Sequence, residues 1–424
     1  MINDDMQFRY RDDGNFVYPD YDGYNFSNIN STILSLFGIN NNGTPLKKEL
    51  YSNLCGSKKV VFFYIDGLGY DSWRNYLEKY RPFEEINSSG IVSPITSVFP
   101  STTAAASNTI NTGMTPAEHG LFEWRLYLEN YNMVVKSLPF IPVYRQDRER
   151  FAELSPDPSI LFHGKTFYET LNEHGIRSYI ISYADLLKSS YSRIMYSGVK
   201  EKKRYDFLFE GFLILRKLLK KVRENSYIFF YIEDPDKMEH RYGPGSPEHI
   251  EALRYIASMF NDFFKDLAGE DIAVMVSSDH GFTPVNKKIY VSGIHDFVKT
   301  NKGRTIPETW SPRDMMVYSD NPEDMKNALE DQLYGSADII TGNEILKMGL
   351  MGRNTVSEKY ISRMGNILVL PYSGNTVWYK YYDDDIIKDR GMHGGLSREE
   401  MIIPFASINL KDIKNYFVFL TRFS

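Results

Sequence analysis

The chain has 424 residues, of which 42% are apolar and 25% are charged, as in an ordinary globular protein with a large buried core. Its 49 Lys and Arg residues against 55 Asp and Glu residues leave a net charge of −6 at pH 7, which argues against a nucleic-acid-binding surface. The longest apolar runs have the length of a strand, whereas a membrane-spanning helix needs about 20 residues, so we expect no membrane segment.

Residues 1–40 are expected to form an N-terminal arm, because turn-forming pairs such as Pro19-Asp20 and Asp22-Gly23 recur there. The arm shows no basic stretch followed by an apolar one, so we expect no secretory signal. Cys55, the single cysteine, excludes a disulfide within the chain and is typical of a reducing compartment. These features favour a cytoplasmic protein.

Buried strands and amphipathic helices alternate through the middle of the chain. The helical segments are residues 204–222 and 246–267, and the second begins with Ser246 as its cap and Pro247 at its first position. Strands that are buried on both faces and separated by helices form parallel sheets. We therefore predict an α/β fold with a largely parallel central sheet and helices on both faces. The predicted strands are residues 59–65, 178–182, 227–232 and 272–277.

The pattern loosens between residues 283 and 388, where Pro, Gly and Asn are scattered among short apolar runs. This stretch separates two groups of candidate site residues, so we predict that it is an inserted cap bordering the cleft. The catalytic α/β core then comprises residues 41–282 and 389–424.

A carboxylate stands at or just after the end of three predicted strands, and these carboxylates belong to Asp66, Asp236 and Asp279. Parallel sheets bind ligands beyond the carboxyl ends of their strands. We therefore expect the three side chains to lie close together at that end of the sheet. His240 follows Asp236 by four residues, a spacing that places both on one face of a helix, and His280 directly follows Asp279. Each piece alone is also compatible with a turn or an exposed loop.

A hydroxyl-rich run, Ser101-Thr102-Thr103, precedes an Ala-rich helical segment. Such residues usually cap helices, and a helix start also stabilises a phosphate anion, so one hydroxyl can cap while another attacks. With His393, which two glycines follow, the set of three Asp, three His and a Thr is the ligand set of a two-metal hydrolase with an alcohol nucleophile. His119 lies two turns or more beyond this helix start, and we expect it to be structural.

Short runs follow one another in a specific order between about residues 58 and 404: Tyr64-Ile-Asp66-Gly-Leu-Gly, Phe99-Pro-Ser-Thr-Thr103, Thr112-Gly113, Pro116-x-x-His119-Gly120, Asp234-Pro-Asp236-x-x-x-His240, Ser278-Asp279-His280-Gly281 and His393-Gly-Gly. Together they resemble the alkaline phosphatase superfamily, and within it most closely the type I phosphodiesterase / nucleotide pyrophosphatase family. The resemblance implies a three-layer sandwich and two divalent metal ions, zinc being the first expectation and manganese or a mixed pair also compatible with Asp and His ligands.

The resemblance also implies a role for each candidate residue. One ion would be held by Asp236, His240 and His393, and the other by Asp66, Asp279 and His280. In this superfamily the nucleophile stands nine residues before the Thr of a Thr-Gly pair, and counting back from Thr112 gives Thr103, with Thr102 as the second choice. A hydroxyl coordinated to a divalent ion becomes a competent nucleophile, and a phospho-threonine intermediate follows.

One position departs from the family pattern. Relatives carry an Asn shortly after the His-Gly pair to bind a phosphate oxygen, whereas Trp124 stands there in this chain, which makes Arg125 the nearest candidate donor. We expect Trp124, Arg125 and Thr102 to contact the substrate. The Asp-Ser-Ala signature of the monoesterases is missing, which favours a small-molecule phosphodiester or nucleotide-like substrate.

The alternatives are a phosphomutase or phosphomonoesterase of the same superfamily, and a binding protein that has lost turnover. The binding protein is disfavoured because all the expected ligands and Thr103 are present. A sulfatase is excluded because Cys55 is not part of the motif that those enzymes require. The sequence does not indicate an oligomeric state.

Overall fold

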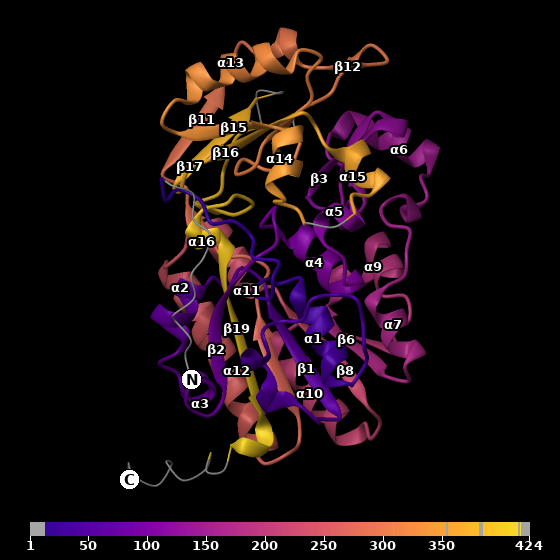
Figure 1. Ribbon diagram of the computed structural model, residues 1–424, viewed down its shortest axis with the longest axis vertical. Coiled ribbons are helices and arrows are strands. Elements are labelled where there is room, and N and C mark those ends of the chain that lie inside the picture. The colour runs from indigo at the N-terminus through magenta and orange to yellow at the C-terminus, as the bar shows by residue number, and fades with distance from the viewer. Residues whose placement is uncertain (1–12, 308, 353–354, 381–384, 414–415, 417–424) are drawn as a thin grey trace.

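The computed structural model describes residues 13–307, 309–352, 355–380, 385–413 and 416. A seven-stranded sheet forms the centre of its larger part, drawn in the lower half of Figure 1, with the strand order β2-β19-β9-β1-β8-β6-β7. All neighbouring strands are parallel except β19, which runs antiparallel to both β2 and β9. The strands are β1 (Lys59–Ile65), β2 (Ile91–Thr96), β6 (Arg177–Tyr183), β7 (Glu201–Tyr205), β8 (Ser226–Ile232), β9 (Ala273–Ser277) and β19 (Ile402–Asn409).

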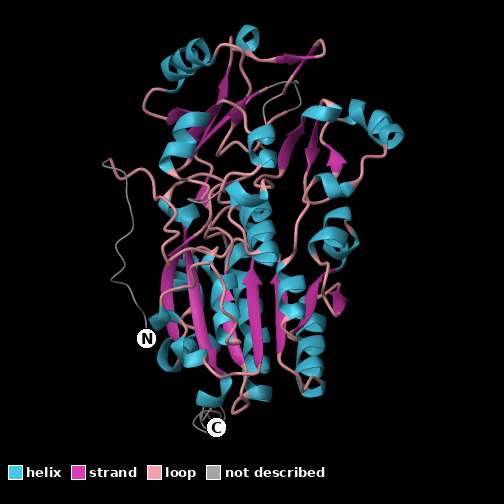
Figure 2. Ribbon diagram, turned by 45° about the vertical axis from the view of Figure 1, so that its right-hand side comes forward, coloured by secondary structure: helices cyan, strands magenta, loops and turns pink. Residues whose placement is uncertain are grey.

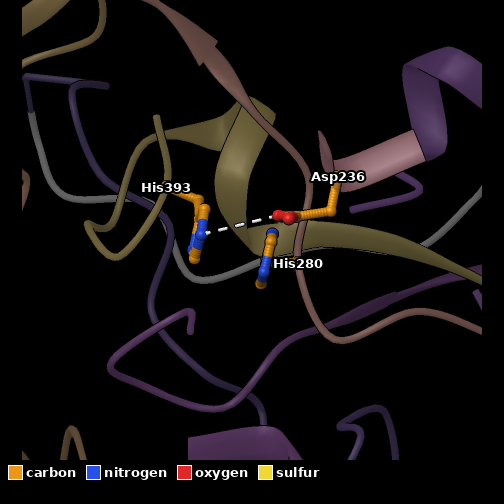
Figure 3. Close-up of side chains that lie close together, drawn as sticks. All are labelled: Asp236, His280 and His393. Carbon is orange, nitrogen blue, oxygen red and sulfur yellow. Dashed lines mark ion pairs between the residues drawn. The ribbon is translucent and has the colours of Figure 1, made fainter. Parts of the chain in front are cut away.

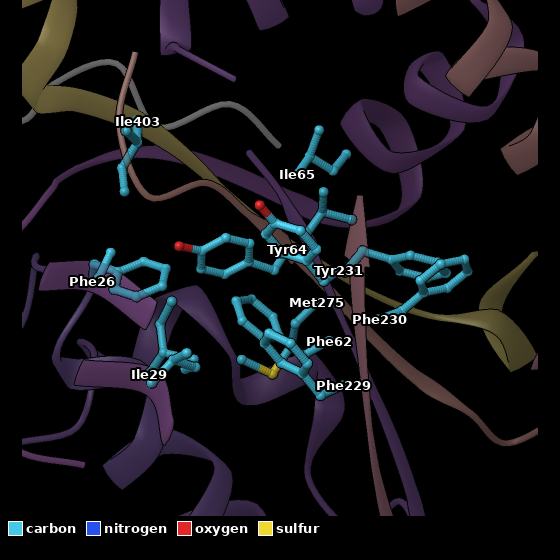
Figure 4. Close-up of a cluster of buried hydrophobic side chains, with 14 of the residues drawn as sticks. Phe26, Ile29, Phe62, Tyr64, Ile65, Phe229, Phe230, Tyr231, Met275 and Ile403 are labelled. Carbon is cyan, nitrogen blue, oxygen red and sulfur yellow. The ribbon is translucent and has the colours of Figure 1, made fainter. Parts of the chain in front are cut away.

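The side chains of β1 alternate between two helical layers, as expected for a strand buried on both faces. Phe63 packs against Phe212 and Phe260, with ring centroids 5.6 Å and 4.5 Å away. Phe62 and Tyr64 point the other way, toward Phe26 and its neighbours (Figure 4). Burying one such ring contributes about 1.5–3 kcal/mol, so this core accounts for a large part of the stability.

Helices on each face supply these partners. One layer contains α3 (Arg81–Ser89), α10 (Leu208–Lys221) and α12 (Pro247–Leu267), and the other contains α1 (Asn28–Leu36), α4 (Thr103–Thr112) and α7 (Phe167–Glu173). The result is the predicted three-layer α/β sandwich, and the predicted fold class is confirmed. None of the helices within the described residues is long and apolar enough to cross a bilayer.

The predicted strands and helices agree closely with those observed. Residues 59–65 form β1, and the other three predicted strands lie within one residue of β6, β8 and β9. Helix α12 starts at Pro247, and the Ser246 side chain accepts a hydrogen bond from His249 N, as its cap position requires. The first residues of the predicted helix 204–222 instead end β7, an edge strand whose exposed charged positions gave it no apolar pattern.

The expected N-terminal arm begins outside the described residues, since residues 1–12 are not among them. From residue 13 onward it is joined to the sheet: Phe26 N donates to Thr96 O at 2.9 Å, and helix α1 buries Ile29 and Ile33 against it. This segment therefore forms part of one helical layer.

The upper part of the molecule in Figure 1 is built mainly from residues 283–388, here called the insert. The chain enters and leaves it side by side, where β10 (Thr283–Pro284) pairs with β18 (Gly391–Met392). The insert has an apolar core of its own, which includes Ile294, Met315 and Leu329. Its main elements are β11 (Lys287–Val291), β14 (Met316–Val317), β15 (Ala337–Thr341), β16 (Ile367–Pro371), β17 (Asn375–Tyr379), α13 (Pro322–Leu333), α14 (Gly342–Met348) and α15 (Glu358–Arg363), with a short hairpin of β12 (Thr300–Asn301) and β13 (Arg304–Thr305).

A small antiparallel sheet from the expected core range lies against the insert. Its strands are β3 (Arg125–Leu128), β4 (Met133–Lys136) and β5 (Ile141–Pro142). Tyr127 and Val134 of this sheet share an apolar cluster with Ile306 and Tyr318 of the insert. The parallel strands of the large sheet point toward this region in Figure 2. Residues at the carboxyl ends of these strands, such as Asp66, Tyr183 and Tyr231, line a cavity that residues of the insert also line.

The remaining helices are short. They are α2 (Tyr70–Ser72), α5 (Pro116–His119), α6 (Arg148–Leu154), α8 (Ala184–Lys188), α9 (Ser190–Met195), α11 (Asp234–Tyr242) and α16 (Arg398–Met401).

Candidate active site

Three adjacent strands, β9, β1 and β8, bring the predicted carboxylates together at their carboxyl ends. Asp66 directly follows β1, and its backbone N–H donates to Ile232 O at 2.8 Å. Asp279 follows β9 after one residue, Ser278, and Asp236 lies in the first turn of α11, the helix that continues from β8. The sheet register therefore places the three carboxylates at the same end of the sheet, beyond the carboxyl ends of the strands, as the sequence predicted.

Asp66, Asp279 and His280 form one buried group whose potential ligand atoms all lie within 4.8 Å of one another. His280 Nε2 is 3.5 Å from Asp66 Oδ1 and 3.2 Å from Asp279 Oδ2. Two carboxylates and an imidazole at this spacing have the composition of a divalent-cation site.

Asp236, His280 and His393 form a second group within the same 4.8 Å limit. Figure 3 shows their side chains converging, with His393 Nε2 3.8 Å from Asp236 Oδ1. His280 therefore takes part in both groups, whereas the resemblance assigned it to one ion only.

His240 lies beside this second group but is not one of its three members. Its Nε2 is 3.5 Å from Asp236 Oδ1, so the two share a helix face as their spacing predicted. Its ring meets that of His393 edge to face at 5.1 Å. The role of His240 as the third ligand of the Asp236 ion stays a prediction.

Hydrogen bonds with neighbouring backbone groups and with the Tyr231 hydroxyl orient these side chains. His393 Nδ1 donates to Ser101 O at 2.9 Å, and His280 Nδ1 donates to Gly281 O at 3.2 Å. Nε2 of each ring therefore faces the neighbouring carboxylates, where a cation would bind. Gly67 N donates to Asp279 Oδ1 at 3.0 Å, and the Tyr231 hydroxyl donates to Asp66 Oδ2. The ligand geometry is thus held by groups outside the ligand set.

Several buried polar atoms in the two groups lack a hydrogen-bond partner among the described residues. They are Asp236 Oδ1, Asp279 Oδ2 and His240 Nδ1. Leaving such atoms buried and unpaired costs about 1–3 kcal/mol each, a cost that bound cations would remove at the two carboxylate oxygens. The residues present therefore fit a pair of divalent ions.

The pKa values of Asp66 and His393 are shifted because these side chains are buried and lie close to other charged groups. Burial, followed by the charges of Asp279 and Asp236, raises the pKa of Asp66 well above its usual range. Burial, followed by the neighbouring charges of His280 and His240, lowers the pKa of His393, which favours the neutral imidazole that binds metals. A cluster with three carboxylates needs cations to be stable in its charged form.

The three candidate hydroxyls have different partners. Thr103, the first residue of α4, has Oγ1 at 3.3 Å from Asp66 Oδ1 and 3.2 Å from His280 Nε2. Thr102 Oγ1 caps α4 by accepting from Ala105 N at 3.2 Å and donates to Phe122 O at 3.1 Å. Ser101 Oγ donates to Gly395 O at 2.8 Å. Of the three, only the Thr103 hydroxyl lies against the ligand groups.

His119 is bound within its own neighbourhood. Its Nδ1 accepts from Leu121 N at 3.0 Å, and its Nε2 lies 3.2 Å from Thr109 Oγ1. Burial lowers its pKa to about 3, so the ring is neutral at pH 7. These contacts agree with the structural role expected for it.

A cavity of about 760 Å³ opens above the two groups. The name floor is used here for Thr103 and the candidate ligand side chains Asp66, Asp236, Asp279, His240, His280 and His393. Thr103, Asp66, Asp236, His240 and His393 line the cavity, whereas Asp279 and His280 are fully buried beside them. The side of the cavity, here called the wall, includes residues from β3 and the segment just before it, from β4 and from the insert: Glu123, Trp124, Arg125, Lys136, Trp310, Trp378 and Asp385.

The predicted substrate contacts Trp124 and Arg125 both belong to the wall. Trp124 is 39% exposed, and the Arg125 guanidinium lies over the Trp378 ring at 5.0 Å from its centroid. Their contact with substrate stays a prediction, as does that of Thr102.

The sequence reasoning missed three residues of this region. Tyr231, which holds Asp66, has a detectable signal, because the register of adjacent parallel strands pairs Tyr64 with Tyr231 just before both strands end. Lys136 and Trp310 have no comparable signal. Lys136 reaches the cavity because β4 pairs with β3, and Trp310 reaches it because the insert packs against that hairpin.

Comparison with known proteins gives one family and a set of similar folds. The model of the family described as type I phosphodiesterase / nucleotide pyrophosphatase matches residues 60–396. No curated protein sequence matches the chain. Several solved structures are similar in fold to this chain, and the similarity covers most of both chains. At identities of 17–18% they show a shared fold.

Murine ectonucleotide pyrophosphatase / phosphodiesterase 5 has a TM-score of 0.62 and 18% identity, covering 82% of this chain and 87% of that one. An inactive variant of that murine protein, in complex with AMP, has a TM-score of 0.62 and 17% identity with the same coverage. Phosphonoacetate hydrolase from Sinorhizobium meliloti 1021, in complex with phosphonoacetate, has a TM-score of 0.61 and 18% identity, covering 82% of this chain and 89% of that one.

Proposed function

The chain belongs to the type I phosphodiesterase / nucleotide pyrophosphatase family of hydrolases, in the alkaline phosphatase superfamily, and from this premise we propose that it cleaves phosphodiester or pyrophosphate bonds through a phospho-threonine intermediate on Thr103. The observation that carries the proposal is the position of the Thr103 hydroxyl. It lies 3.3 Å from Asp66 and 3.2 Å from His280, at the junction of both ligand groups.

Two divalent ions fit this floor. Asp66, Asp279 and His280 would hold one, and Asp236 and His393 the other, with His240 as its third ligand. When bound, such ions lower the pKa of the attacking hydroxyl and offset the charge that develops on the phosphoryl oxygens. We propose zinc, with manganese or a mixed pair as substitutes, because Asp and His ligands suit these ions.

The chain's own residues then act in two displacements. In the first, Thr103 Oγ attacks phosphorus, and the bond between phosphorus and the leaving oxygen breaks. In the second, water attacks the phosphorus of the phospho-threonine and restores the Thr103 hydroxyl. The start of α4 would favour the anion in both steps, because Thr103 is the first residue of α4 and the N-terminus of a helix carries partial positive charge.

Cavity size and composition support a diester over a monoester. A volume of about 760 Å³ has room for a second ester group beside the phosphorus, and the wall offers aromatic surface to it. The AMP complex of the murine relative and the phosphonoacetate complex of the bacterial one support a small-molecule substrate.

The test combines metal analysis with kinetics. Metal content after zinc or manganese loading is measured by plasma mass spectrometry, and turnover is measured on bis-p-nitrophenyl phosphate and on p-nitrophenyl phosphate. We expect two metal equivalents, faster turnover of the diester, and a loss of at least about 10³-fold in Thr103→Ala with its metal retained. Ser107→Ala, which removes another hydroxyl from the same helix, serves as the matched control.

The other outcomes point elsewhere. Undiminished activity in Thr103→Ala rules out the phospho-threonine mechanism. Faster turnover of the monoester indicates a phosphomonoesterase, and return of the phosphoryl group to a substrate alcohol indicates a phosphomutase. Absence of all turnover with both metals bound indicates a binding protein.

A further inference from the structure

Two cations face each other across the hairpin that forms part of the wall. Strands β3 and β4 pair antiparallel with Arg125 directly opposite Lys136, so both side chains lie on the same face of the sheet. Both line the cavity above the floor. Like charges at directly opposed positions destabilise a sheet, so this pair costs stability unless a negative group lies near it.

Among the described residues, the positive charge of Arg125 has little compensation. Its Nη1 atom is buried and has no hydrogen-bond partner among the described residues. The nearest carboxylate oxygen, Asp385 Oδ1, lies 3.9 Å from it, beyond hydrogen-bond range. The other oxygen of that carboxylate accepts from Trp378 Nε1 at 2.9 Å. The guanidinium thus keeps unused donor capacity at the cavity.

Lys136 has no ion-pair partner in the part of the chain that the structure describes. Its Nζ lies 5.9 Å from the centroid of the Trp124 ring, which is a weak contact. Lys237, another lysine that lines the cavity, instead pairs with Glu233 at 2.6 Å. Burial, followed by the charges of Arg125 and Arg148, lowers the pKa of Lys136, as expected for an ammonium group with no carboxylate partner among the described residues.

Two further groups on the same wall suit an anionic ligand. Trp310 Nε1 is a buried donor without a partner among the described residues. Glu123, the buried carboxyl next to Arg125 in the chain, has its pKa raised well above the usual range by burial and then by the charge of Asp314. A neutral Glu123 does not repel an anion.

We propose that Arg125 and Lys136 bind a second phosphate group of the substrate, separate from the phosphorus that Thr103 attacks. Arg125 offers the planar, paired donors that match phosphate oxygens, and Lys136 adds a point charge from the opposite strand. The inference rests on the proposed function and specifies its substrate class as a phosphodiester that carries an additional phosphate.

A matched pair of substrates tests this contact. The p-nitrophenyl ester of thymidine 5′-monophosphate is compared with the same ester bearing a 3′-phosphate. We expect wild type to prefer the phosphorylated ester in kcat/KM. Lys136→Met should lose roughly 10- to 100-fold more on the phosphorylated ester than on its unphosphorylated twin, and added salt should shrink the wild-type preference.

Control variants separate this loss from a structural effect. Lys136→Arg keeps the charge and should retain most of the preference. Lys58→Met removes an exposed lysine at the opposite end of β1 and should leave the preference as in wild type. If Lys136→Met does not fold, Lys136→Gln replaces it.

Failure of the inference differs from failure of the proposed function. Hydrolysis of both esters without a preference, or equal losses on both in Lys136→Met, overturns the second phosphate contact alone. Isothermal calorimetry measures the same contact without turnover. Wild type should bind thymidine 3′,5′-bisphosphate roughly 10- to 100-fold more tightly than thymidine 5′-monophosphate. Lys136→Met should bind the two nucleotides with equal affinity. Equal affinities for wild type overturn the inference whether or not the protein hydrolyses esters.

Discussion

The floor and the wall of the cavity are built in different ways. Floor side chains stand at the ends of strands, on the helix that continues from β8, and at the start of α4. Backbone groups orient two of them: Gly67 N holds Asp279, and Ser101 O holds His393. Wall side chains come from a hairpin and the insert and contact one another mainly through rings and charges, as Arg125 does with Trp378.

This difference indicates that the floor and the wall have different roles in catalysis and in substrate recognition. The floor can impose one geometry on the reacting phosphorus, because the sheet that carries it is buried on both faces. The wall consists of side chains on short strands and loops, where substitution changes what is recognised at small cost to the fold. We therefore expect floor variants to change kcat and wall variants to change KM.

One buried ion pair joins the two regions. Arg313 of the insert donates from Nε and Nη2 to the Glu400 carboxylate at 2.9 and 2.7 Å, and both residues are fully buried. Glu400 also accepts from Gly395 N at 3.0 Å and Ser397 N at 3.1 Å. The pair thus links the insert to the loop that carries His393.

Metal removal should have the largest effect and should act on the floor. A chelator is expected to lower activity on the order of 10³-fold, because the ions supply several kcal/mol of transition-state stabilisation. Thermal stability should fall as well, since a ligand that binds only the folded state stabilises it. Re-addition of zinc should restore both. Full activity of the metal-free protein, checked by mass spectrometry, would contradict the assignment of the floor.

Arg313→Met should break the link between the two regions. The expected loss is about 3–5 kcal/mol in the free energy of unfolding, because Glu400 is left as an unpaired buried charge. Denaturant titration measures it. The double variant Arg313→Met with Glu400→Met removes that charge and should recover part of the loss; an additive result would show that the two side chains are not coupled.

Tyr231→Phe should weaken the floor without removing a ligand. The variant deletes the hydroxyl that donates to Asp66 Oδ2. A hydrogen bond to a charged group contributes about 1.5–3 kcal/mol, so we expect a loss of roughly 10-fold or more in kcat. Steady-state kinetics on bis-p-nitrophenyl phosphate measures it. A change confined to KM would place Tyr231 in substrate binding.

Trp124→Ala should have the smallest effect and should act on the wall. Aromatic contacts of this kind contribute about 0.5–1.5 kcal/mol, so KM should rise roughly 2- to 10-fold with a smaller change in kcat. The same kinetics measure it. A loss mainly in kcat would mean that Trp124 contacts the reacting phosphorus, and the distinction between floor and wall would fail at this position.

Prediction from the sequence was most successful where the signal is local. Asp66 and Asp279 end apolar runs, and Asp236 and His240 have helical spacing, so their common location followed from the rule for parallel sheets. The nucleophile needed the family resemblance, because the sequence alone left three hydroxyls open. The edge strand β7 was missed because its exposed face carries charges in place of the apolar pattern.

The wall was predicted only in part, through the resemblance at Trp124 and Arg125. Lys136 is joined to Arg125 by a hairpin register that no periodicity reveals. Trp310 reaches the cavity through the docking of the insert, where Trp310 N donates to Arg125 O at 3.1 Å. Such contacts join residues that are distant along the chain, and their partners cannot be read from either segment.

The sequence by itself determined the α/β class and the strand ends that carry the carboxylates, because hydrophobic periodicity and residue spacing are properties of short segments. The assignment of ligands to two metal ions came from the family resemblance and stays a prediction. Tertiary structure decided that His280 takes part in both ligand groups, that the Thr102 hydroxyl caps α4 while that of Thr103 lies against the ligands, and that Arg125 and Lys136 face the cavity together. These arrangements depend on the register of paired strands and on the packing of separate segments, which arise only when the chain has folded.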